Sequence, residues 1–112
     1  MKIAIPCANG VLCTHFGHCR EFALISVSQV TRTISGTAFL TPPAHEPGVL
    51  PKWLHEQGVN VIIAGGMGMR AQQFFSQYGI RVVTGAPAGE PAGIAKQWLE
   101  GSLSTGENVC DH

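Results

Sequence analysis

The sequence is poor in charge. Asp, Glu, Lys and Arg make up only 12% of its 112 residues, and seven basic and seven acidic side chains leave a net charge of zero. Because no stretch collects Lys or Arg, the chain lacks the electrostatic footprint that a phosphate backbone or an anionic membrane surface requires. We therefore expect neither nucleic acid nor a membrane as a partner.

Aspartate is almost absent, since Asp111 is the only one in the chain. A two-metal nuclease needs several converging carboxylates to hold its Mg²⁺ ions. The composition therefore excludes that class of enzyme.

A long hydrophobic run is missing as well. The start, MKIAIPCANG, has one Lys and a short apolar stretch that stops at Pro6, which is typical of neither a signal peptide nor a membrane span. We therefore expect a cytoplasmic protein. In that reducing compartment the four cysteines, Cys7, Cys13, Cys19 and Cys110, are predicted to be thiols available for metal or redox chemistry.

The length and the 45% of hydrophobic residues suit one buried core. We predict a single domain over residues 1–102. The remaining residues, 103–112, have the composition of a loop and are predicted to form a flexible C-terminal tail.

Apolar patterns predict eight helices and strands in this domain. Alternating or continuous apolar stretches predict strands at 2–6, 20–27, 31–41, 59–64 and 80–84. Apolar side chains at helical spacing, with Pro or Gly near the ends, predict helices at 48–57, 69–78 and 92–100. The first two strands are expected to be joined by a long loop.

The predicted order is βββαβαβα, an antiparallel meander followed by two right-handed crossover units. It predicts an α/β fold with a five-stranded mixed sheet, and it is the order found in ribonuclease H-like domains. If the second strand is antiparallel to the first, then the first, third, fourth and fifth strands all end at one rim of the sheet. Open α/β sheets bind ligands at such a rim.

A group of cysteine and histidine residues follows the first strand. Cys7, Cys13, His15, His18 and Cys19 offer thiolate and imidazole groups, which suit Cu(I), Zn, iron–sulfur or thiometalate centres better than Mg or Ca. Their spacing matches neither a zinc ribbon nor a ferredoxin. A structural role in the core or in a loop is the alternative for any single member, but it accounts poorly for five such residues in thirteen positions.

The fourth strand runs into a glycine-rich turn, GGMGMRA. Its backbone N–H groups and the start of the following helix favour an anion, such as an anionic cluster or an oxyanion. Close packing of the helix on the strand is the alternative. The candidate residues in this turn are Gly65, Gly66, Met67, Gly68, Met69 and Arg70.

Three more candidates come from other parts of the chain. His45 follows the third strand and is expected at the same rim. The tail carries Cys110 and His112, and at about 3.3 Å per extended residue it is long enough to return to the rim.

Five segments of the chain match one known family: MKIAIP, HFGHCREF, PGVLPKWLHEQGVNVIIAGGMGMRAQQFF, GIRVVTGA and GENVCDH. Over nearly its whole length the chain resembles the dinitrogenase iron-molybdenum cofactor biosynthesis proteins. The resemblance implies a ribonuclease H-like fold that binds a molybdenum–iron or molybdenum–copper sulfide cluster without catalysing a reaction. It also implies that His15, Cys19 and the GGMGM turn contact the cluster, with Cys110 and His112 as tail ligands.

Three functions remain open on the sequence alone. The first is a carrier or assembly protein for a metal–sulfur cluster, which is delivered to a recipient or assembly protein. The second is a module with a mononuclear Zn or Cu site, in contact with a partner such as an ATPase. The third, ranked last, is an enzyme whose nucleophile is a thiolate of low pKa at Cys7 or Cys19.

Overall fold

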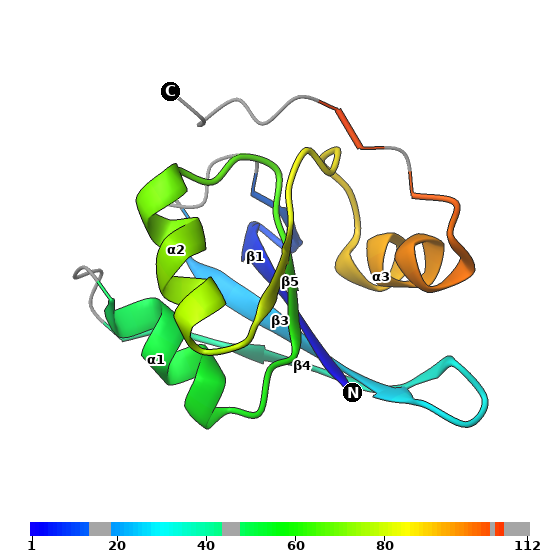
Figure 1. The fold of residues 1–112 in the computed structure, drawn as a ribbon. Coiled ribbons are helices and arrows are strands. Elements are labelled where there is room, and N and C mark those ends of the chain that lie inside the picture. The colour runs from blue at the N-terminus through cyan, green and yellow to red at the C-terminus, as the bar shows by residue number, and fades with distance from the viewer. Residues whose placement is uncertain (14–18, 44–47, 104, 107–112) are drawn as a thin grey trace.

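A mixed sheet with helices on both faces forms the described part of the chain, residues 1–13, 19–43, 48–103 and 105–106 of the computed structural model (Figure 1). The strands are β1 (Lys2–Ala8), β2 (Val11–Leu12), β3 (Glu21–Ser28), β4 (Thr33–Leu40), β5 (Val61–Ile63) and β6 (Arg81–Val83). The helices are α1 (Val49–Glu56), α2 (Met69–Gln77) and α3 (Pro91–Glu100). The predicted α/β class with a mixed sheet is confirmed. No helix in these ranges is long and apolar enough to span a bilayer.

The sheet contains one strand that the sequence analysis missed. β2 pairs antiparallel with the last two residues of β1, so the connection predicted as a long loop begins as a hairpin. Asn9 and Gly10 form its turn, with positive φ angles of 56° and 80°. A type I′ turn requires positive φ at both positions, and Asn-Gly adopts it readily. That dipeptide was the available signal for the hairpin.

The strand directions bring four strand ends to one rim. The order across the sheet is β4-β3-β1-β5-β6. β3 is antiparallel to β1 and β4, whereas β5 is parallel to β1 and β6. β1, β4, β5 and β6 therefore end together, as predicted, at what we call the carboxyl rim.

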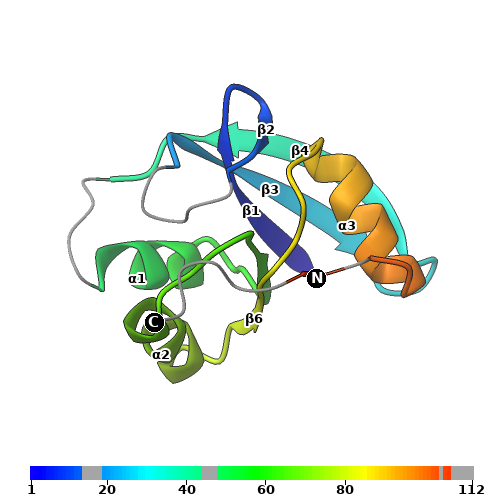
Figure 2. The same ribbon diagram turned by 90° about the horizontal axis from the view of Figure 1, so that it is seen from above.

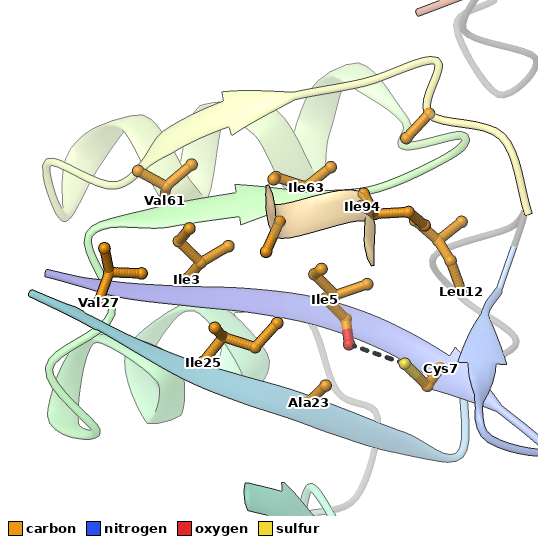
Figure 3. Packing of buried hydrophobic residues seen from close by; sticks show 12 residues of the cluster. Ile3, Ile5, Cys7, Leu12, Ala23, Ile25, Val27, Val61, Ile63 and Ile94 are labelled. Atoms are coloured by element: carbon orange, nitrogen blue, oxygen red, sulfur yellow. Dashed lines mark hydrogen bonds between the residues drawn. The ribbon is translucent and has the colours of Figure 1, made fainter. Parts of the chain in front are cut away.

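The sheet divides the core into two layers, because α1 and α2 cover one face and α3 covers the other (Figure 2). The α3 layer consists of Ile3, Ile5, Cys7, Leu12, Ala23, Ile25, Val27, Val61, Ile63, Ala86, Ile94 and Ala95 (Figure 3). The α1/α2 layer consists of Ala4, Cys19, Phe22, Leu24, Leu50, Leu54, Val59, Ile62, Ala64, Met67, Phe75 and Ile80. Successive residues of a strand alternate between the two faces, so neighbours in the sequence enter different layers.

β5 has both of its faces buried. Val61 and Ile63 belong to the α3 layer and Ile62 to the α1/α2 layer. A strand covered by helices on both sides needs a continuous apolar run. This explains why the stretch 59–64 carries no polar side chain except Asn60.

β4 forms an edge of the sheet, and most of its residues are exposed. None of them carries a charge. Gly36 lies opposite Ser26 and Ile34 lies opposite Val27, which leaves Ser35 as the extra residue of a β-bulge. The bulge therefore interrupts the regular pairing of β4 with β3.

Candidate functional site

The segment that carries the first group of candidates is attached at both ends to the end of β1. The Cys13 N–H donates to the Pro6 carbonyl at 2.8 Å, and the Arg20 N–H donates to the Cys7 carbonyl at 2.9 Å. Both ends of this segment are thus held at the carboxyl rim. His15 and His18, which belong to it, lie outside the described residues.

The sheet separates the three described cysteines. Cys19 is buried in the α1/α2 layer, and the half-buried Cys13 packs against the same layer. Cys7 is buried in the α3 layer, where its thiol donates to the Ile5 carbonyl at 3.3 Å (Figure 3). Cys7 lies two residues after Ile5 and therefore on the same face. The structure thus brings Cys13 and Cys19 together and places Cys7 on the other side of the sheet.

The glycine-rich turn lies on the side of Cys13 and Cys19. Met67 is fully buried in the α1/α2 layer, so two thiols and a thioether belong to one group of packed side chains. We call Cys13, Cys19 and Met67 the sulfur group. Its members come from the loop after β2 and from the turn between β5 and α2, both at the carboxyl rim.

The start of α2 directly follows Met67 of this sulfur group and is suited to an anion. Its N-cap is Gly68, no described side chain caps it, and the first turn has no acidic residue. The first N–H groups of a helix have no acceptor within the helix and carry partial positive charge. Met69 and Arg70 are exposed in this first turn, which places a guanidinium near the same helix end.

Gln72 is a residue of this region that the sequence analysis did not single out. Its side-chain amide donates to the Met67 carbonyl at 2.9 Å, and its backbone N–H donates to the Gly68 carbonyl at 3.1 Å. The two bonds hold the glycine-rich turn against the first turn of α2. A Gln on a helix is so common that nothing in the sequence marked this role.

Gly85 is a second residue that was missed. Its N–H donates to the Gly65 carbonyl at 2.6 Å, and its carbonyl accepts from the Gly106 N–H, also at 2.6 Å. The beginning of the predicted tail is therefore tied to the domain, and Leu103 packs against the α3 layer. The chain has 14 glycines, and no local pattern distinguished this one.

The predicted ligand set is only partly described. Among the residues that the structure describes, no three His, Cys, Asp or Glu side chains converge on one point. His15, His18, His45, Cys110 and His112 lie outside those residues, so their role as ligands stays a prediction.

Burial controls the acidity of the two buried thiols. It raises the pKa of Cys7 to about 11 and, together with the nearby Cys13, that of Cys19 to about 12, because the thiolate would lose its hydration. Both groups are therefore protonated at neutral pH.

The raised pKa of Cys7 makes the protein less stable in alkali. The folded chain keeps the proton while the unfolded chain loses it, so this stabilisation is complete below about pH 9 and is lost as the pH rises toward 11. Between about pH 8 and pH 10, Cys7 should account for a loss of about 1 kcal/mol in the free energy of unfolding. Urea titrations at both pH values should show that the free energy of unfolding falls less between pH 8 and pH 10 in Cys7→Ala than in the wild type. Equal losses in the two proteins would contradict the raised pKa of Cys7.

Comparisons with known proteins agree on a family. The model of the family described as "Dinitrogenase iron-molybdenum cofactor" matches residues 1–101. An uncharacterized protein of Methanocaldococcus jannaschii is 33% identical over 108 residues, which cover 92% of this chain and 89% of that protein.

Solved structures show the same fold. The crystal structure of PH0822 has a TM-score of 0.84 and 28% identity, with 94% of each chain covered. The apo form of the orange protein from Desulfovibrio gigas has a TM-score of 0.71 and 20% identity, with 96% of this chain and 93% of that chain covered. With the family match over residues 1–101, these results show that the chain belongs to the dinitrogenase iron-molybdenum cofactor family.

Proposed function

We propose that the protein binds a metal–sulfur cluster at the carboxyl rim and carries it, or helps to assemble it, without catalysing a reaction. The observation that carries this proposal is the sulfur group: Cys13, Cys19 and Met67 belong to one layer of the core, and Met67 directly precedes the N-cap of α2. Membership of a family named after the iron-molybdenum cofactor supports the same function.

The chemistry of the rim suits such a cargo. Thiolates and thioethers are soft ligands that prefer Cu(I), iron–sulfur and thiometalate centres. A metal sulfide cluster is an anion, so the N–H groups at the start of α2 and the Arg70 guanidinium complement its charge. Because Cys19 is protonated in the unloaded protein, binding through this sulfur releases a proton.

The cargo that we propose is a molybdenum–iron or molybdenum–copper sulfide. The family description supports molybdenum and iron, and the soft sulfur ligands suit copper. We assign further contacts to Gly65, Gly66 and Gly68 in the turn and, from the undescribed residues, to His15, His18, His45, Cys110 and His112. Cys7 is left out, because it belongs to the α3 layer.

The remaining parts of the proposal concern the setting of this function. We propose a ribonuclease H-like domain that works in the cytoplasm and passes the cluster to a recipient or assembly protein. A mononuclear Zn or Cu module, in contact with an ATPase, is the second candidate, because Cys and His are also the usual ligands of zinc.

Metal and sulfide analysis tests the two candidates directly. Untagged protein is purified without oxygen from its native host, and its metals, acid-labile sulfide and visible absorption are measured. We expect coloured protein that contains molybdenum, with iron or copper and sulfide in stoichiometric amounts. Zinc or copper without sulfide would establish the second candidate instead.

Protein isolated without metal needs one more measurement. Tetrathiomolybdate and Cu(I) are then added to the metal-free protein under argon, and uptake is followed by visible absorption. Saturable uptake supports the carrier, whereas the absence of uptake contradicts it.

A further inference from the structure

We propose that Gly85 is the positioning residue that docks the C-terminal segment on the carboxyl rim and couples this docking to the state of the glycine-rich turn. The docking stands on the structure alone. The coupling rests on the proposed function, because it concerns a cluster bound at that turn.

A chain of main-chain hydrogen bonds connects the turn with the C-terminal segment. The Gly65 carbonyl accepts from the Gly85 N–H, and the Gly85 carbonyl accepts from the Gly106 N–H, both at 2.6 Å. Two more bonds extend the pairing of β5 with β6 beyond the strand ends: the Ala64 N–H donates to the Val83 carbonyl and the Ala86 N–H to the Ala64 carbonyl. The Gly85 and Ala86 donors depart from the regular parallel register, and Gly85 is held where the pairing of β5 with β6 ends, between the turn and Gly106.

Only glycine fits at position 85. Its φ angle is +81°, which residues other than glycine rarely adopt. A Cβ atom there would also overlap the carbonyl of Gly106, and the atoms that it would meet first all belong to the Gly106 main chain. Because a main chain cannot rotate out of the way as a long side chain can, a Cβ at position 85 must push Gly106 off the rim.

The path of the chain after α3 agrees with docking. Gly101 ends α3 in the left-handed conformation and Leu103 packs against the α3 layer. In Figure 1 the chain then rises from α3 toward the loop that follows β6. Cys110 lies four residues beyond Gly106 in the sequence and outside the described residues.

The hydrogen bonds connect the two events, and thermodynamic linkage makes their coupling reciprocal. A cluster that orders the turn also orients the Gly65 carbonyl, and thereby strengthens the chain of bonds to Gly106. If the bound cluster increases the equilibrium constant for docking by some factor, the docked segment must increase the affinity for the cluster by the same factor. The C-terminal segment thus contributes to cluster binding through the main chain, apart from any ligands that it carries.

Amide exchange in the metal-free protein tests the docking. In the wild type, the Gly106 N–H should exchange more slowly than an unprotected amide, and Gly85→Ala should speed its exchange by about tenfold or more. Gly79→Ala is the matched control: Gly79 has a similar φ of +73°, but a Cβ there meets nothing within 4 Å. An unprotected Gly106 in the wild type, or equal effects of the two variants, would overturn the docking.

A second variant covers the case in which Gly85→Ala does not fold. Gly106→Pro removes the N–H donor at an exposed position and leaves the core untouched. It should increase the fast motion of the Thr105 amide, measured by the heteronuclear NOE, while the amides of β5 and β6 stay unchanged. An unchanged Thr105 would contradict the docking.

Uptake of tetrathiomolybdate with Cu(I) tests the coupling. Gly85→Ala and Gly106→Pro should both bind this probe about fivefold or more weakly than the wild type, whereas Gly79→Ala should bind it equally well. Equal binding by Gly85→Ala and the wild type would overturn the coupling and leave the proposed function intact. A wild type that binds no probe, with a protected Gly106, would refute the function and the coupling but not the docking.

Discussion

Replacing Cys13 and Cys19 together by serine is expected to abolish cluster binding, with a loss of affinity greater than about 100-fold. Both sulfur atoms belong to the sulfur group at the carboxyl rim, and a serine hydroxyl is a poor ligand for soft metals. The loss of groups that merely orient ligands already costs about 10- to 100-fold in metal affinity. Binding of tetrathiomolybdate and Cu(I), followed by absorption, measures the effect.

Cys7→Ser is the control for this experiment. It introduces the same change of atom at a fully buried cysteine, but in the α3 layer. Its loss of stability should resemble that of the double variant, as judged by circular dichroism and urea unfolding, while its affinity for the probe stays near that of the wild type. If Cys7→Ser lost binding as completely as the double variant, the assignment of the site to one side of the sheet would be wrong.

Removing the ring of Phe75 should have the largest effect on stability. Phe75 lies on α2, is fully buried and belongs to the α1/α2 layer together with Met67 and Cys19. Phe75→Ala should lower the free energy of unfolding by about 3–5 kcal/mol, because it removes buried apolar surface and leaves a cavity. Urea unfolding at neutral pH measures the loss.

The neighbouring residue provides a matched comparison. Phe74 lies on the same helix but is only partly buried. Phe74→Ala makes the same chemical change and should cost less than half as much, because less apolar surface leaves water. Similar losses for the two variants would show that α2 is not anchored through Phe75.

The sequence predicted the fold best where local pattern and burial agree. The continuous apolar run at 59–64 predicted a strand buried on both faces, and β5 is that strand. Its length was overestimated, because β5 pairs with only Ile3 and Ala4 of β1 and with three residues of β6. Pairing partners set the end of a strand, and a single segment of sequence does not contain them.

The candidate site was predicted less completely, for two physical reasons. Cys7 was grouped with Cys13 and Cys19 because they are close in the sequence, although alternation along β1 sends Cys7 to the face of Ile5. Gly85 escaped notice because its bonds to Gly65 and Gly106 join main-chain atoms. Main-chain hydrogen bonds between distant segments leave no signature in residue type.

The bulge at Ser35 has a consequence for how the protein meets copies of itself. An uncharged edge strand invites a strand of another molecule to add to the sheet, and β4 carries neither charge nor proline to prevent this. The extra residue breaks its eight positions into two short stretches, Thr33–Ile34 and Gly36–Leu40, that do not continue one regular hydrogen-bonding pattern. An incoming strand therefore finds no full-length template. The irregular edge protects the folded protein against aggregation, a role that charged side chains play on the edge strands of other proteins.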